Sequence, residues 1–254
     1  MKLGAYPAAS TLGGKPVEIV SVFCGASEAW PSPGAGRDLL VSWHLDQGSG
    51  GGTYAWWANG NGDRIATTAA KRAAGLSARG VYVRPWAECN ADWVDFGQAS
   101  DFVAAWRRVR TIFKQRAPRV TFLFNPTTDT YDGCWDVRQV WPGNEYVDLH
   151  GLDGYNWARS EYGGWRSFDD IYWEQYARLQ ACAPLPVWVC EFGCAERPAI
   201  NDKGQWYRDM ADVIPRRYPQ IQALVTFNVN KEEDWRVNSS ASALSGFTAA
   251  MTKL

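Results

Sequence analysis

The chain has 254 residues, of which 46% are hydrophobic and 21% charged, and its formal net charge is −1. The length fits one barrel of eight strand–helix units, and the composition is ordinary for a globular protein. A near-neutral chain has no electrostatic footprint for nucleic acid or an anionic membrane, and no apolar run approaches the roughly 18–20 residues of a membrane span. We therefore expect neither as a partner.

Eight short apolar segments are predicted to be strands. They are Leu3–Tyr6, Glu18–Phe23, Leu39–Trp43, Val81–Trp86, Val120–Phe124, Val147–Leu152, Pro186–Glu191 and Ala223–Asn228. Helical patterns alternate with most of them, which favours a parallel sheet. Since no linker or repeat is visible, we predict an α/β protein with one (β/α)8 (TIM) barrel domain over residues 1–254.

Several stretches between these strands have helical spacing. Ser100 or Asp101 is expected to cap a helix whose apolar face is Phe102, Trp106, Val109 and Phe113. Similar stripes predict helices over 168–180 and 205–217, and a closing helix over 240–251. Little room for a helix exists between the first two strands.

Aromatic residues are unusually abundant, with 15 Trp and 11 Tyr. Many of them are expected in the core, but the flat face of Trp also stacks well on pyranose rings. The aromatic content therefore leaves room for a carbohydrate ligand.

The cysteines give no metal-binding pattern. They are Cys24, Cys89, Cys134, Cys182, Cys190 and Cys194. None forms a C-x-x-C pair and the chain has two His, so we expect no zinc site and no cofactor. Cys89 and Cys190 each adjoin a candidate catalytic glutamate, and we expect buried free thiols there.

Two glutamates follow predicted strands at positions suited to catalysis. Glu88 follows the fourth strand and Glu191 ends the seventh. In a barrel, the C-terminal ends of the strands surround the active site. A retaining glycosidase needs two carboxyl groups about 5–5.5 Å apart, one as acid/base and one as nucleophile. Taken singly, each glutamate fits a helix cap or a surface residue better than a catalytic role.

Further polar and aromatic residues end the third and sixth strands. Tyr155 could donate a hydrogen bond to the Glu191 carboxylate, or it could be an ordinary packed tyrosine. His44 could bind a sugar hydroxyl or a carboxyl group, or lie in the core. His150 lies within the sixth strand and is expected to be structural.

Several motifs, in order, resemble glycoside hydrolase family 26, whose best-known members are β-mannanases. The matching segments are SWH (42–44), ANGNGDRIATTAAKRAA (58–74), RPWAECNADW (84–93), PGNEYVDLHGLDGYNW (142–157), VCEFG (189–193) and FNVNKEEDWRVNSS (227–240). The resemblance extends from about residue 39 to 240, and the segments 142–157 and 227–240 are the most specific.

This resemblance implies a retaining barrel enzyme without a metal requirement. It places Glu88 as the acid/base, Glu191 as the nucleophile and Tyr155 beside the nucleophile. The remaining residues expected to contact substrate are His44, Arg84, Trp86, Asn90, Trp93, Trp157 and Trp235.

The sequence departs from the family pattern beside the acid/base. Ala87 stands where the family usually has His, and Cys89-Asn90-Ala91 replaces Met-Asn-Gly. The two-carboxylate chemistry does not depend on these positions, but sugar specificity does. We expect an endo-acting hydrolase of a β-linked polysaccharide, with β-mannan as the family default. The alternatives are a non-catalytic glycan-binding barrel and a depolymerase of a bacterial envelope glycan.

The N-terminal MKLGAY lacks the apolar region of a signal peptide. We expect a secreted or extracellular enzyme, which would require a trimmed leader or another export route; an intracellular location is the alternative. We expect a monomer that acts on a poly- or oligosaccharide.

Overall fold

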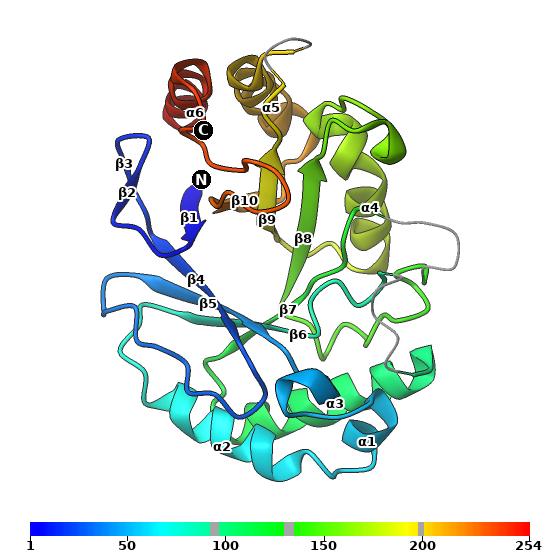
Figure 1. Ribbon diagram of the computed structural model, residues 1–254. Coiled ribbons are helices and arrows are strands. Elements are labelled where there is room, and N and C mark those ends of the chain that lie inside the picture. The colour runs from blue at the N-terminus through cyan, green and yellow to red at the C-terminus, as the bar shows by residue number, and fades with distance from the viewer. Residues whose placement is uncertain (92–96, 130–134, 198–200) are drawn as a thin grey trace.

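The computed structural model describes residues 1–91, 97–129, 135–197 and 201–254. Eight parallel strands close into a barrel in the order β1-β10-β9-β8-β7-β6-β5-β4 (Figure 1). The strands are β1 (Lys2–Tyr6), β4 (Ile19–Cys24), β5 (Asp38–Trp43), β6 (Val81–Pro85), β7 (Thr121–Phe124), β8 (Leu149–Asn156), β9 (Val187–Cys194) and β10 (Ile221–Phe227). The predicted (β/α)8 class is confirmed, and each predicted strand overlaps one of these eight.

Helices surround much of the barrel (Figure 1). They are α1 (Tyr54–Ala58), α2 (Asp63–Ala74), α3 (Ala99–Arg116), α4 (Phe168–Cys182), α5 (Lys203–Arg217) and α6 (Ala241–Lys253), with short 3-10 turns η1 (Gln47–Ser49) and η2 (Ser160–Tyr162). The predicted capping of α3 is wrong. Gln98 precedes the helix without a side-chain capping bond, so Ser100 and Asp101 lie within the first turn.

A small hairpin replaces the helix between the first two barrel strands, where the sequence left little room. It consists of β2 (Thr11–Leu12) and β3 (Lys15–Pro16), and Figure 1 shows it beside β1 and β4. Gly13 at its turn has φ +54°, and a Cβ atom there would lie 2.8 Å from the Phe247 ring of α6. Glycine is therefore needed both for the backbone conformation and for close packing.

The interior of the barrel has an apolar lower layer. Its buried residues come from strands only: Ile19, Leu40, Leu123, Leu149, Trp188, Cys190, Ala223 and Val225. The Tyr82 ring packs against Trp188, with centroids 4.1 Å apart. Because alternate residues of a strand point to the same side, Arg84 lies one layer above Tyr82, toward the C-terminal ends. Polar side chains thus replace apolar ones where the site begins.

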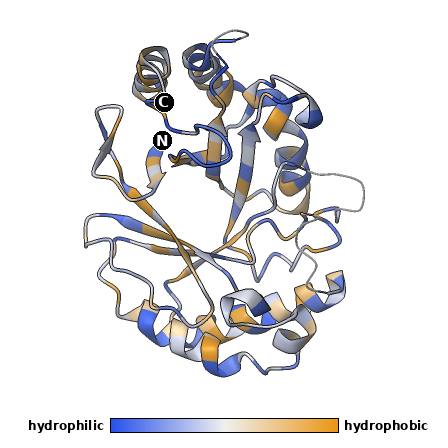
Figure 2. Ribbon diagram, viewed as in Figure 1, coloured by the Kyte–Doolittle hydropathy of each residue, from blue (hydrophilic) through white to orange (hydrophobic). Residues whose placement is uncertain are grey.

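A second core fills the space between the strands and the helices. All four residues of the predicted α3 stripe are buried there, with at most 1% exposure. Full burial of such side chains contributes about 1.5–3 kcal/mol each. Figure 2 shows hydrophobic residues concentrated in the strands and along parts of the helices, with hydrophilic positions interspersed.

A β-bulge in β9 breaks the alternation of its side chains. Pairing with β8 passes from Leu152–Val189 directly to Asp153–Glu191, which leaves Cys190 as the extra residue. Cys190 belongs to the inner core, whereas Val189 and Phe192 belong to the outer one. Regular alternation would turn Glu191 outward, and the bulge re-aims it into the barrel.

The five described cysteines are free thiols, and all but Cys182 are buried, as expected for Cys89 and Cys190. Cys134 lies outside the described residues. Within the described part of the chain, no helix has the length and apolarity to cross a membrane.

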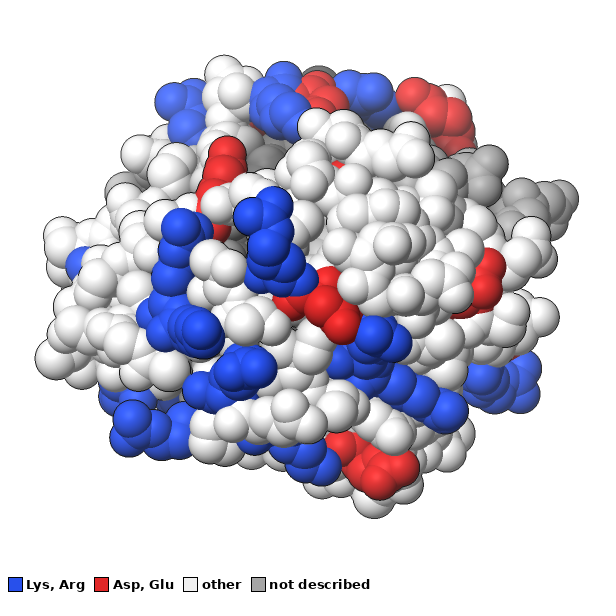
Figure 3. All heavy atoms as spheres, turned by 90° about the horizontal axis from the view of Figure 1, so that it is seen from below, with Lys and Arg blue, Asp and Glu red and all other residues white. Residues whose placement is uncertain are grey.

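Charge is unevenly distributed over the surface. The face viewed in Figure 3 carries more basic than acidic side chains. On α2 and α3, the exposed basic residues are Arg64, Lys71, Arg72, Arg107, Arg108, Lys114 and Arg116. Arg108 is paired with Asp63 at 2.7 Å. The near-zero net charge of the chain therefore reflects compensation across the whole molecule.

Candidate active site

Arg84 lies at the centre of the site, on β6, with 0% exposure. Its Nη1 donates to Oδ2 of Asp153 at 2.5 Å, its Nε donates to Oγ of Ser42 at 2.8 Å, and its Nη2 donates to Oε1 of Glu191. These bonds connect four strands at the C-terminal end of the barrel. The expected substrate contact of Arg84 needs correction, because its buried guanidinium instead orients the carboxylates.

Glu191 is held on both carboxylate oxygens. While Arg84 bonds Oε1, the hydroxyl of Tyr155 donates to Oε2 at 2.6 Å. The Tyr172 hydroxyl also lies 3.3 Å from the main-chain oxygen of Glu191. The Glu191 side chain retains 13% exposure, so it remains accessible from the mouth of the barrel.

Tyr155 is arranged to remain a hydrogen-bond donor. Burial raises the pKa of its hydroxyl well above the ordinary value, and the negative charge of Glu191 adds to this effect. A protonated phenol can stabilise the Glu191 carboxylate throughout the physiological range. The predicted Tyr155–Glu191 bond is thus present.

Asp153 is the second carboxylate bonded to Arg84 and is fully buried. Burial raises its pKa, Arg84 opposes this effect, and the nearby Glu191 and Glu88 carboxylates reinforce it. Its Oδ1 has no hydrogen-bond partner among the described residues. Arg84, Asp153 and Glu191 therefore form one group of interacting charges at the C-terminal end of the barrel.

Glu88 lies at the turn after β6 in an unusual backbone conformation. Its φ is +60°, a left-handed value that is uncommon for a residue other than glycine. Its N–H donates to the Asn125 oxygen at 2.7 Å, which ties the turn to the end of β7. Strain of this kind concentrates at functional sites. The charges of Glu88 and Glu191 both raise the pKa values of Asp153 and Tyr155, so both carboxylates act on the same two groups.

Asn90 supports this turn from a buried position. Its Nδ2 donates to the Thr127 oxygen at 3.1 Å, and its Oδ1 accepts from the Thr127 N–H at 2.8 Å. With 1% exposure, it cannot contact a glycan in this structure. The expected substrate contact is therefore replaced by a role in joining the loops after β6 and β7.

Two of the expected substrate-binding tryptophans are also buried. Trp86 is 4% exposed and packs edge-to-face against Tyr54 and Trp57. Trp235 is 1% exposed and packs behind Tyr155, with centroids 4.8 Å apart. Both expectations need correction, because these rings support the site from within the core.

The other expected contacts have different placements. His44 is exposed and stacks on Phe23, with centroids 5.8 Å apart. Trp157 is half-buried, and its Nε1 donates to Oδ2 of Asp129 at 3.0 Å. Both remain available at the mouth. Trp93 lies outside the described residues.

An aromatic groove at the mouth was missed in the sequence. Its floor is formed by Tyr6, Phe23 and Phe227, near the ends of β1, β4 and β10, and its volume is about 350 Å³. The Tyr6 and Phe227 rings stack with centroids 5.4 Å apart, and Phe227 meets Tyr155 edge-on at 6.0 Å. The sequence could have indicated this groove, because an aromatic residue lies at or next to the C-terminal end of each of these strands.

Among the described residues, no group of three or more His, Cys, Asp or Glu side chains is arranged to hold a metal ion. The charged groups described above instead form a carboxylate site ordered by one arginine and one tyrosine. Such a site can present an oriented nucleophile and a nearby second carboxyl group.

No protein-family model matches the chain. In sequence it is similar to Endoglucanase H of Acetivibrio thermocellus, with 30% identity over 261 aligned positions that cover 94% of this chain. The chain spans 28% of the length of Endoglucanase H, so the match relates it to one segment of a longer protein.

Solved structures with similar folds come from glycoside hydrolase family 26. The catalytic domain of the endo-β-1,4-mannanase from Bacillus sp. JAMB-750 has a TM-score of 0.69 at 16% identity, covering 99% of this chain and 85% of that one. The β-mannanase from Bacteroides ovatus has a TM-score of 0.63 at 16% identity, with 94% and 80% covered. The chain thus has the fold of family 26 barrels, which confirms at the level of fold the resemblance of its motifs.

Proposed function

We propose that this chain is a retaining, endo-acting glycoside hydrolase that cleaves a β-linked polysaccharide at the mouth of the barrel. The observation that carries the proposal is the double anchoring of Glu191 by Arg84 and Tyr155. A positive charge and a phenol donor favour an ionised, fixed carboxylate, which is what a nucleophile requires. The similarity to Endoglucanase H and to family 26 mannanases supports the same reaction class.

In this proposal, Glu191 attacks the anomeric carbon and forms a covalent glycosyl ester as the glycosidic bond breaks. Its own negative charge is lost in that step, and Arg84 is left paired with Asp153. The Tyr155 hydroxyl can then donate to the sugar side of the site. Water hydrolyses the ester, which restores the carboxylate and gives overall retention of configuration.

Glu88 serves as the acid/base in the same scheme. It first protonates the departing glycosidic oxygen and then accepts a proton from the attacking water. The effect of its charge on the pKa values of Asp153 and Tyr155 supports a carboxyl group close to these two residues. The main-chain bond to Asn125 keeps the turn in place between the two steps.

The glycan is proposed to lie over the aromatic groove of Tyr6, Phe23 and Phe227, with Trp157 next to Tyr155. Aromatic faces stack on the apolar faces of pyranose rings. β-Mannan is the first candidate because the similar structures include endo-β-1,4-mannanases. Ala87 provides no imidazole beside Glu88, so related β-glycans and bacterial envelope glycans are tested in parallel.

The activity assay compares β-mannan, β-1,3-xylan, mixed-linkage β-glucan and bacterial envelope glycans. We expect endo-type products from at least one polymer, and we expect Glu88→Ala and Glu191→Ala each to remove most of that activity. Full activity in either variant would exclude the assignment. If the protein binds one of the polymers but cleaves none of them, the result would instead support a glycan-binding barrel, which the loss of the histidine suggests.

We further propose that the chain acts outside the cell as a monomer, since a polymeric glycan does not enter the cell intact. Detection of the native protein in the culture medium and a single species of about 28.4 kDa in solution would support this.

A further inference from the structure

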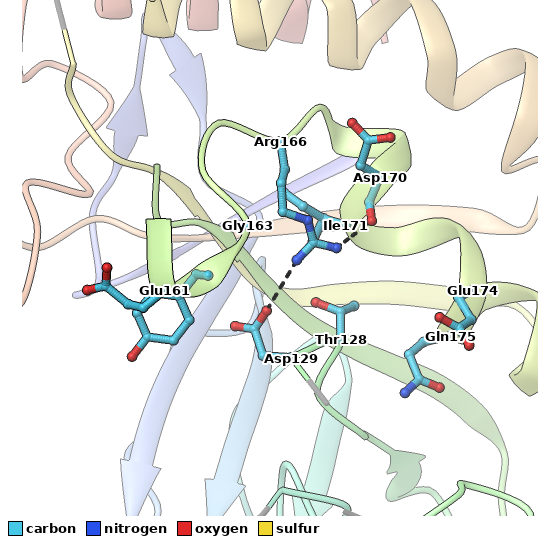
Figure 4. Close-up of a pocket in the computed structure, with 10 residues that line it drawn as sticks. Thr128, Asp129, Glu161, Gly163, Arg166, Asp170, Ile171, Glu174 and Gln175 are labelled. Atoms are coloured by element: carbon cyan, nitrogen blue, oxygen red, sulfur yellow. Dashed lines mark hydrogen bonds and ion pairs between the residues drawn. The ribbon is translucent and has the colours of Figure 1, made fainter. Parts of the chain in front are cut away.

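A side pocket of about 380 Å³ lies among the segments that follow β7 and β8 and the helix α4. We define it by Thr128 and Asp129 after β7, Tyr162 and Arg166 after β8, and Glu174 and Gln175 on α4. Figure 4 shows Arg166 pointing toward Asp129, with Gln175 and Glu161 on opposite sides of the pocket. Its volume lies within the range of small-molecule sites.

Trp157 contacts both Tyr155 of the proposed active site and two residues that line this pocket, Asp129 and Tyr162. One side of its ring system meets Tyr155, with centroids 5.8 Å apart. Its Nε1 donates to Asp129, and its ring stacks on Tyr162 at 4.9 Å and 24°. Trp157, with Asp129 and Tyr162, therefore connects the pocket to the proposed active site.

Buried polar groups in the pocket have hydrogen-bonding capacity to spare. Gln175 is 3% exposed and Thr128 is 7% exposed. None of the described residues bonds to Oε1 of Gln175 or to Oγ1 of Thr128. Buried polar atoms are normally paired, because an unpaired one costs about 1–3 kcal/mol. Both atoms are enclosed by protein, so a ligand hydroxyl group reaches them only if these side chains turn toward the pocket.

The charges of the pocket indicate which ligands it would accept. Four carboxylate side chains and one guanidinium line it. Arg166 already donates to the Asp170 main-chain oxygen and lies 3.8 Å from Asp129. Burial raises the pKa of Asp129, while Trp157 and Arg166 oppose this effect. A ligand carboxylate would meet a surplus of negative charge, whereas hydroxyl groups would find both donors and acceptors.

We propose that the side pocket binds one uncharged sugar residue of the glycan, next to the cleavage site, and discriminates against carboxylated sugars. This proposal rests on the proposed function for the identity of the ligand as part of a substrate. The Tyr162 ring provides an apolar face, while Gln175, Asp129 and Arg166 bind the hydroxyl groups.

The test is a titration of ¹⁵N-labelled protein with the methyl β-glycosides of glucose, galactose and mannose, and with methyl β-glucuronide. The Trp157 indole N–H signal, assigned with Trp157→Phe, reports binding next to Asp129. We expect at least one neutral glycoside to shift this signal at millimolar concentration, and the glucuronide to bind at least fivefold more weakly. Gln175→Leu and Arg166→Ala should each weaken neutral binding at least fivefold.

Trp173→Ala provides a matched control on α4, because Trp173 is 44% exposed and stacks with Arg217 away from the pocket. It should bind within twofold of the original chain. The proposal is overturned if no neutral glycoside shifts the signal, if both pocket variants bind unchanged, or if the glucuronide binds as well as the neutral sugars. The titration needs no turnover, so inactivity on polymers would refute the hydrolase proposal without altering this result.

Discussion

Arg84 donates to Glu191 from a position that has no exposed surface. The same guanidinium bonds Asp153, which is also fully buried. A buried cation is tolerated only when it is paired, so each of the three charges depends on the other two. This network gives Glu191 its orientation before any substrate arrives.

Arg84→Met should therefore impair both folding and catalysis. Removing one partner of a buried ion pair leaves uncompensated charge, and we expect a loss of about 3–5 kcal/mol in the free energy of unfolding. Denaturant unfolding measures this loss. Arg108→Met, which disrupts an exposed pair with Asp63, is the control and should cost under about 1 kcal/mol. Equal losses in the two variants would contradict the network.

Tyr155→Phe should reduce kcat. The variant loses one hydrogen bond to a carboxylate, worth about 1.5–3 kcal/mol, which corresponds to a decrease of about 10–100-fold if the bond acts in the transition state. Kinetics on the best polymer from the activity screen provide the measurement. Tyr176→Phe loses only a contact to the Gln220 N–H, so its kcat should be unchanged. A similar kcat for Tyr155→Phe and the original chain would exclude a catalytic contribution of this hydroxyl.

Gly193→Ala tests the packing behind Tyr155. A Cβ atom there would lie 2.8 Å from Cε3 of Trp235 and 3.1 Å from Cδ1 of Tyr155. We expect a loss of about 1–3 kcal/mol from overpacking, together with lower activity as the Tyr155 ring shifts. Thermal unfolding and initial rates report these effects. Gly36→Ala is the control, because a Cβ atom at Gly36 would have no heavy atom within 4 Å, and it should change neither the melting temperature nor the initial rate. If Gly193→Ala also changes neither, the site tolerates movement of these rings.

His150 should make stability depend on pH. Burial lowers its pKa to about 4, from an ordinary value of about 6.5. Between these values the unfolded chain binds the proton and the folded chain does not. Its contribution is therefore fully present above pH 6.5 and is lost as pH falls toward 4, by up to about 3 kcal/mol.

His150→Gln can retain the bond to the Ala183 oxygen, which the imidazole Nε2 makes at 2.9 Å. Denaturant unfolding at pH 7 and pH 4 should show a smaller loss of stability in the variant than in the original chain. Carboxylates that titrate in this range contribute to both proteins, so their effects largely cancel in the difference. Parallel pH profiles would refute the buried, neutral state of His150.

The barrel was predictable because its signals are local and repeated. Short apolar strands alternate with amphipathic helices, and all four residues of the α3 stripe are buried as their spacing predicts. The positions of Glu88 and Glu191 at strand ends followed from the same regularity. The Tyr155–Glu191 hydrogen bond was also predictable, since the two residues lie on neighbouring strands near their C-terminal ends.

Other features depend on irregularities that sequence spacing does not reveal. The bulge at Cys190 turns the Glu191 side chain into the barrel. The left-handed backbone of Glu88 occurs in the turn after β6, where its N–H bonds to Asn125 after β7. Trp86 and Trp235 show the opposite error. Trp86 is two residues before Glu88, and Trp235 belongs to a segment that resembles family 26, but tertiary packing places both rings in the core. The aromatic groove was overlooked because its residues are scattered along the chain.

The central claim is that Glu191 forms the covalent bond to the sugar. A 2-deoxy-2-fluoro glycoside with a good leaving group, made from the sugar of the best polymer, should inactivate the protein. Mass spectrometry should then show one added sugar per chain, on the peptide containing Glu191, and no addition in Glu191→Ala. Rapid cleavage of the polymer with no adduct, or an adduct on another residue such as Glu88, would contradict the account.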